Sequence, residues 1–102
     1  MKHVKQQDVS GCGIACVAMM AGEHVTYQMV RDVWMNNLNG KEERITRGDG
    51  LRIFEVQDLA HMFGVKSFPY VAPTIIQIDS KSGRGGHYVV LTKEGTILDP
   101  SA

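Results

Sequence analysis

No part of the sequence approaches the roughly twenty consecutive apolar residues that a membrane-spanning helix needs. The first residues, "MKHVKQQDVSG", also lack the apolar core of a secretion signal. Basic and acidic residues are balanced at 11 each, which gives no electrostatic reason to expect a nucleic acid or an anionic membrane as partner. These absences predict a cytoplasmic protein with no membrane segment and no nucleic acid partner.

Cysteine occurs only twice, at Cys12 and Cys16, which is too few for a disulfide scaffold. A zinc site built on these cysteines and two histidines is the chief competing chemistry. However, the Cys-x3-Cys spacing differs from the usual Cys-x2-Cys knuckle, and no His-x3-His pair completes it. A thioredoxin-like redox motif fails on the same spacing and on the missing βαβ unit. We therefore expect no metal and no cofactor.

The chain does contain enough residues for one domain, and we expect a single domain over residues 1–102. Hydrophobic residues make up 43%, which is ordinary for a globular protein and argues against disorder. The sequence has no internal repeat and no low-complexity segment.

Helical patterns fill the first two thirds of the chain. Residues 12–21 are almost all small or apolar, so they predict a helix buried on every side that ends at Gly22. A second helix is expected from about Thr26 to Asn36, and a third from about Leu51 to Phe63. The charged, glycine-punctuated segment "NLNGKEERITRGDG" predicts a loop. In the third helix the residues expected to face inward are Ile53, Val56, Leu59, Ala60 and Phe63.

Strand patterns follow Gly64. The short segments "VKSFPYV", "TIIQID", "HYVVLTK" and "TILDP" are rich in β-branched residues, and "SKSGRGG" is a flexible connection. Because the helices come first and the strands second, the predicted class is α+β, with an antiparallel sheet.

The candidate nucleophile is Cys12, which stands between two glycines at the expected start of the first helix. Free backbone N–H groups and the helix dipole stabilise a thiolate at that position. The glycines on both sides leave room for a substrate backbone to approach. The alternative is that Cys12 is only a small buried residue, which is the expected state of Cys16.

The candidate base is His87, because it opens an apolar strand directly after a double glycine. A thiol that transfers acyl groups needs such a base, an orienting group and donors for the oxyanion. His3 falls in the N-terminal arm, His24 in a turn and His61 on the third helix, so we assign these three to surface or local roles.

The candidate orienting group is Asp99, and its position depends on the turn "KEG". Three residues ending in glycine suit a type I turn followed by a left-handed residue. In that register Thr92 faces Thr96 and Val89 faces Asp99, which puts Asp99 on the face of His87, one diagonal away. A two-residue loop would move Asp99 to the other face. Alternatively, Asp before Pro is a common turn opening.

A side-chain amide near Cys12 is expected to complete the oxyanion site with the Cys12 backbone N–H. Gln6 and Gln7 are both suitably close, and their chemistry does not choose between them.

The stretches "QQDVSGCGIACVAM", "APTIIQI", "GHYVVL" and "ILDP" resemble the bacteriocin-processing cysteine peptidase family. The resemblance covers nearly the whole chain and implies a papain-like fold and cleavage of leader peptides after a double glycine. The family pattern has a Gln six residues before the nucleophile, which selects Gln6. Its Cys-Gly-x-Ala matches Cys12, Gly13 and Ala15. Its later His and Asp-Pro correspond to His87, Asp99 and Pro100.

Family members are usually fused to an export transporter, and no transporter segment follows here. They also usually continue with segments that finish the sheet and the substrate groove, whereas this sequence stops two residues after Pro100. Three interpretations stay open: a minimal stand-alone member, a clipped form, and a domain that a partner completes.

The resulting expectation is a cysteine peptidase that acts on a peptide or protein through a thioester. Cys12 attacks, His87 moves the proton, Asp99 orients His87, and Gln6 helps to bind the oxyanion. One alternative is a peptide-binding module with weak or no turnover on the same fold. Another is a thiol acyltransferase or amidase that acts on a non-peptide substrate.

Overall fold

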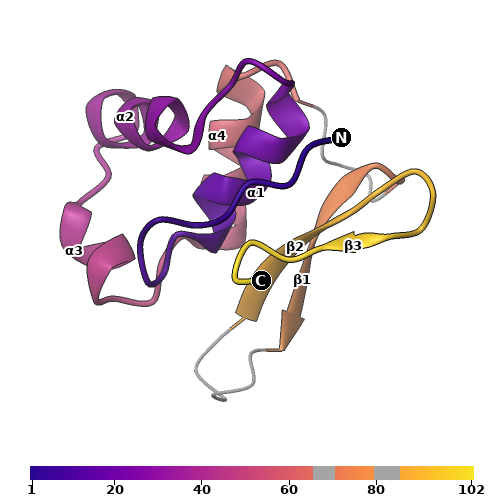
Figure 1. Ribbon diagram of the computed structural model, residues 1–102. Helices are drawn as coiled ribbons and strands as arrows, with labels where there is room; N and C mark the ends of the chain where they lie inside the picture. The colour runs from indigo at the N-terminus through magenta and orange to yellow at the C-terminus, as the bar shows by residue number, and fades with distance from the viewer. Residues whose placement is uncertain (66–70, 80–85) are drawn as a thin grey trace.

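The computed structural model describes residues 1–65, 71–79 and 86–102. Within these residues the helices precede the strands, and Figure 1 shows the helices on one side of the molecule and the sheet on the other. The α+β class predicted from the sequence is confirmed. The elements in chain order are α1 (Cys12–Ala21), α2 (Tyr27–Asn37), α3 (Glu42–Thr46), α4 (Ile53–Met62), β1 (Thr74–Asp79), β2 (Gly86–Leu91) and β3 (Ile97–Leu98).

Helix α1 is the centre of the core, and it packs against α2, α4 and β2. Its residues from Gly13 to Met19 are all buried, as expected for a helix without a polar face. Gly22 follows it with a positive φ of 119°, which ends the helix. The bounds predicted from the sequence are confirmed, and the first residue of this buried helix is Cys12.

Helices α2 and α4 cover α1 and also lie close to the predicted ranges. Thr26 caps α2 by accepting a hydrogen bond from the Met29 backbone at 3.2 Å. Trp34 on α2 is fully buried. In α4, three of the five residues expected to face inward are fully buried, and Ile53 and Phe63 are half-buried against the core.

The charged segment predicted as a loop contains the short helix α3, so that prediction is wrong in part. Glu42 and Glu43 lie in its first turn, where acidic side chains stabilise the helix dipole. Ile45 is fully buried, and Arg44 bonds to Glu55 of α4 and, at 2.9 Å, to the Gly50 carbonyl. Tertiary contacts therefore hold a helix of five residues that its own sequence does not specify.

The sheet is antiparallel in the order β1-β2-β3. Strand β1 has the predicted bounds, while β2 and β3 lie within or close to theirs. Residues 66–70 of the predicted strand "VKSFPYV" and residues 80–85 of the predicted connection lie outside the described residues.

The turn between β2 and β3 has the predicted register. The Thr92 backbone N–H donates to the Thr96 carbonyl at 2.8 Å, and Gly95 has a φ of +87°. The next pairs along the ladder are Leu91 with Ile97 and Val90 with Leu98. Continuing the antiparallel register sets Asp99 opposite residue 89, on the face that carries His87.

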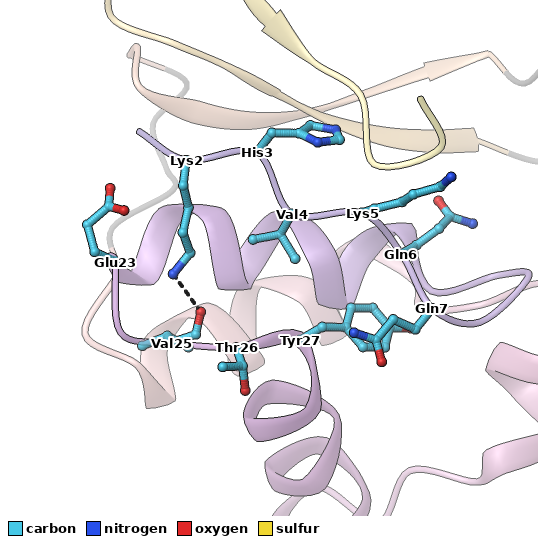
Figure 2. A pocket seen from close by; sticks show the side chains of 10 residues that line it. All are labelled: Lys2, His3, Val4, Lys5, Gln6, Gln7, Glu23, Val25, Thr26 and Tyr27. Atoms are coloured by element: carbon cyan, nitrogen blue, oxygen red, sulfur yellow. Dashed lines mark hydrogen bonds between the residues drawn. The ribbon is translucent and has the colours of Figure 1, made fainter.

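The N-terminal arm, residues 1–6, crosses the molecule without regular secondary structure (Figure 1). Lys2 donates to the Gly22 carbonyl at 2.6 Å and to the Val25 carbonyl at 2.8 Å. At its other end the Gln6 backbone N–H donates to the Pro100 carbonyl at 2.9 Å. Figure 2 shows the arm between α1 and the C-terminal segment, beside a pocket of about 480 Å³. The arm thus ties the region around α1 to the end of the sheet.

Candidate active site

The candidate base and its orienting group are in direct contact. His87 Nε2 lies 2.7 Å from Asp99 Oδ1, and the two side chains are 19% and 38% exposed. His87 lies at the start of β2, and Asp99 lies directly after β3. The three-residue turn carries the second strand back in the register that lets these side chains meet.

This contact fixes which nitrogen of His87 carries a proton. A carboxylate only accepts hydrogen bonds, so Nε2 is the donor to Asp99. In the neutral imidazole Nδ1 is then the acceptor. Nδ1 is therefore the nitrogen that is able to take a proton from a thiol.

Asp99 is stabilised as a carboxylate. Partial burial raises its pKa, but hydrogen bonds from His87 and Ser101 outweigh that effect and lower the pKa to about 2. Ser101 donates from its backbone N–H at 2.9 Å and from its hydroxyl at 2.7 Å, both to Oδ1. The side chain therefore stays charged at neutral and mildly acidic pH.

The lowered pKa of Asp99 predicts a loss of stability in acid. The unfolded-state pKa is about 3.9, so the folded state binds the proton less tightly and gains stability from Asp99 above that value. That contribution is lost as the pH falls toward the folded-state pKa of about 2. We expect the difference in free energy of unfolding between wild type and Asp99→Asn to shrink from about pH 5 to pH 2 in urea titrations. A difference that stays constant across that range would contradict the assignment.

Cys12 is the first residue of α1 and is half-buried. Its thiol lies against the backbone of Tyr88, the residue that follows His87, and the Asp99 carboxylate is close enough to act on it electrostatically. The packing of α1 on β2 thus brings together groups separated by about 75 positions in the sequence.

The pKa of the Cys12 thiol departs from the expectation for a helix N-terminus. Burial raises it and outweighs the backbone N–H groups of Tyr88, Gly13 and Cys12, which lower it, and the Asp99 charge raises it further. The helix-terminus argument predicts a stabilised thiolate; here the loss of hydration has the larger effect. Burial therefore opposes the loss of the proton from this thiol.

The glycines beside Cys12 serve packing and not the approach of a substrate, which corrects the expectation from the sequence. A Cβ on Gly11 would lie 1.9 Å from the Tyr27 hydroxyl. A Cβ on Gly13 would lie 3.0 Å from Val56 and 3.5 Å from the Tyr88 ring. Both positions are buried and face the protein interior.

Gln6 is held close to Asp99 because its backbone N–H donates to the carbonyl of Pro100, the next residue. Its side-chain Nε2 donates to the Asp8 carbonyl at 3.1 Å and to the Val9 carbonyl at 2.8 Å. Among the described residues, its buried Oε1 has no hydrogen-bond partner. Both amide hydrogens are thus directed into the loop before Cys12. Gln7 is exposed.

Asp8 organises that loop, a role that the sequence analysis missed. Its carboxylate accepts from the Tyr27 hydroxyl at 2.6 Å and from Arg31 Nε at 3.0 Å. Its carbonyl accepts from the Gly11 backbone at 3.1 Å. Tyr27 and Arg31 are four positions apart on α2 and so share one face. This spacing indicates a shared binding partner only when Asp8 is known to lie opposite both side chains.

Tyr27→Phe tests this anchor. The Tyr27 hydroxyl is hydrogen-bonded to a charged acceptor, so we expect a loss of about 1.5–3 kcal/mol in the free energy of unfolding. Tyr88→Phe is the matched control, because its hydroxyl donates to the neutral Leu51 carbonyl and its loss should cost about 0.5–1.5 kcal/mol. Urea denaturation measures both values. A smaller cost for Tyr27→Phe than for Tyr88→Phe would contradict the role given to Asp8.

The remaining cysteine and histidines lie mostly where the sequence predicts. Cys16 is fully buried, and burial raises its pKa well above the usual range. His24 and His61 are exposed. His3 is also exposed, but its Nε2 donates to the Asp99 carbonyl at 2.6 Å, so it contacts the candidate site from the arm.

In the part of the chain that the structure describes, no group of three or more His, Cys, Asp or Glu side chains is arranged to hold a metal ion. No helix in that part is long and apolar enough to cross a membrane.

A family model described as the peptidase C39 family matches residues 1–101. The chain belongs to the peptidase C39 family. C39 proteins are the bacteriocin-processing cysteine peptidases, so the resemblance stated from the sequence motifs is confirmed. The four helices and the three-stranded antiparallel sheet within the described residues are consistent with the papain-like fold of C39 domains.

Membership of the C39 family supports a cysteine peptidase-like function for this chain, within the hydrolases, and implies a peptide substrate. A search of curated proteins returned no match, and neither did a search of solved structures.

Proposed function

We propose that this C39 chain hydrolyses peptide bonds through a thioester formed on Cys12, with His87 as the general base and acid and Asp99 as its orienting group. The observation that carries the proposal is the 2.7 Å contact between His87 and Asp99, formed beside the backbone against which the Cys12 thiol packs.

This geometry supports the following proposed reaction. Nδ1 of His87 takes the proton of the Cys12 thiol as sulfur attacks the substrate carbonyl carbon. The tetrahedral intermediate collapses when the C–N bond breaks, and the imidazolium returns the proton to the leaving amine. Water then attacks the thioester with His87 again as base, which releases the acid and restores the thiol. Asp99 keeps Nε2 protonated and stabilises the transient imidazolium.

The oxyanion site is proposed to use the Cys12 backbone N–H and one amide hydrogen of Gln6. The structure supports this with the bond between the Gln6 backbone and Pro100. The family resemblance stated above, whose pattern has a Gln six residues before the nucleophile, agrees with it. Because both amide hydrogens bond to loop carbonyls in the resting protein, one of them must exchange its partner for the developing oxyanion.

Cleavage after a double glycine is proposed from the family alone. A direct test is hydrolysis of a peptide with an internal Gly-Gly, compared with the same peptide carrying Ala-Ala. Cleavage of both peptides at equal rates would limit the function to a general peptidase.

Alkylation of Cys12 tests whether Cys12 and His87 act as a pair. Burial alone predicts that Cys12 reacts more slowly than free cysteine with limiting iodoacetamide, since thiolate is the reactive form. If His87 accepts the proton, wild type is labelled faster than free cysteine at pH 6, and His87→Ala is labelled more slowly than free cysteine. Mass spectrometry over pH 5–8 locates the adduct and measures the rate. Equal rates in the two proteins would contradict a Cys12–His87 pair.

The second candidate function is a peptide-binding module with weak or no turnover. The raised pKa of the Cys12 thiol and the engagement of both Gln6 amide hydrogens favour it. It predicts slow alkylation in both proteins and saturable peptide binding without product. Transfer of an acyl group to an amine instead of water would indicate the acyltransferase alternative, and hydrolysis of a non-peptide amide would indicate the amidase.

A further inference from the structure

Within the described residues, Oδ1 of Asp99 accepts three hydrogen bonds. One comes from His87 Nε2 at 2.7 Å, and two come from Ser101, through its backbone N–H at 2.9 Å and its hydroxyl at 2.7 Å. Two of the three donors that hold this oxygen therefore belong to one residue, which has not been given a role in the proposed reaction.

In the part of the chain that the structure describes, little else holds the Asp99 side chain, so it depends on this support. The residue follows a strand of only two residues, and its side chain is 38% exposed. Pro100, the residue after Asp99, restricts the backbone there. The Ser101 N–H then donates back to the Asp99 carboxylate, as in an Asx turn. The turn is also closed by the Ala102 N–H, which donates to the Asp99 carbonyl at 3.2 Å.

We propose that Ser101 is a positioning residue of the peptidase site. Its two hydrogen bonds hold the Asp99 carboxylate in place, and the carboxylate in turn orients the His87 imidazole. The inference rests on the proposed function. It adds a residue beyond the four motif residues on which that function is built, because the last of the quoted motifs, "ILDP", ends at Pro100.

The expected consequence concerns orientation and not substrate binding. Without the Ser101 hydroxyl, Oδ1 keeps only one Ser101 donor, and the exposed carboxylate gains freedom to rotate. The His87 imidazole is then held less firmly in one tautomer and in one orientation. We expect Ser101→Ala to lower kcat about 10-fold with KM unchanged, within the range that small displacements of a catalytic group cost.

The first measurement does not depend on activity. Long-range ¹H–¹⁵N spectra of histidine-labelled protein report the tautomer of each imidazole, and the His87→Ala spectrum identifies the His87 signals. Wild type is expected to hold His87 with the proton on Nε2. Ser101→Ala is expected to shift its nitrogen signals toward a mixture of tautomers. Ser101→Thr, which keeps the hydroxyl, is expected to retain the wild-type signals and kcat.

Thr46→Val is the matched control, because it removes a hydroxyl on α3 that donates to the Glu42 carbonyl, outside the candidate site. Wild-type nitrogen signals and kcat in Ser101→Ala would overturn the proposal, and so would failure of Ser101→Thr to restore them. If wild type cleaves no peptide, the proposed function fails. The tautomer signals then still decide whether Ser101 positions Asp99.

Discussion

Replacement of Cys12 by alanine is expected to lower kcat for hydrolysis of a double-glycine peptide on the order of 10⁶-fold. The reason is that no other thiol is able to form the acyl-enzyme. Cys16 is fully buried inside α1, and burial raises its pKa well above the usual range. Product formation followed by chromatography, with enzyme in large excess to detect slow turnover, measures the loss.

Cys16→Ala is the control for this experiment. It lies on the same helix one turn later, so it tests whether any change in α1 reduces activity. We expect it to keep wild-type kcat and to lower stability modestly, because its side chain contributes only to packing. Cleavage by Cys12→Ala within tenfold of wild type would end the thioester account, whatever the behaviour of Cys16→Ala.

Gln6→Ala is expected to lower kcat by about 100- to 1000-fold, the usual cost of deleting one oxyanion donor. KM should change little, because the negative charge on the substrate carbonyl oxygen, which the Gln6 amide would bind, is larger in the transition state than in the bound substrate. Steady-state kinetics on the same peptide separates the two parameters.

Gln7→Ala provides the comparison, since the neighbouring glutamine is exposed and carries the same amide. It should keep wild-type kcat. Gln6 also donates to the Asp8 and Val9 carbonyls, so Gln6→Ala could act by loosening the loop. Alkylation of Cys12 distinguishes the two causes: a lost oxyanion donor leaves the alkylation rate near wild type, whereas a loosened loop changes it. Equal kcat in Gln6→Ala and Gln7→Ala would remove Gln6 from the proposed mechanism.

The helices were predictable where their pattern is local. The apolar run from residue 12 to 21 followed by glycine defines α1, and Thr26 before a periodic segment defines the start of α2. Helix α3 was not predictable in this way. Its single buried side chain, Ile45, and the bonds from Arg44 to Glu55 and Gly50 exist only when α4 is already in place.

The same distinction between local and distant contacts applies to the candidate site. The pairing of His87 with Asp99 was predictable, because a three-residue turn ending in glycine sets the register of two adjacent strands. The roles of Asp8 and His3 were not predictable, since each contacts residues far away in the chain. The glycines beside Cys12 were misinterpreted for the same reason: their close neighbours belong to α2, α4 and β2.

The sequence by itself determined the helix that begins at Cys12, the strand that carries His87 and the register that brings Asp99 to it, because each depends on neighbouring residues and short turns. Only the tertiary structure decided the state of the thiol. Burial against β2 raises the pKa of Cys12 more than the end of its own helix lowers it, and hydration is lost only when distant parts of the chain pack together.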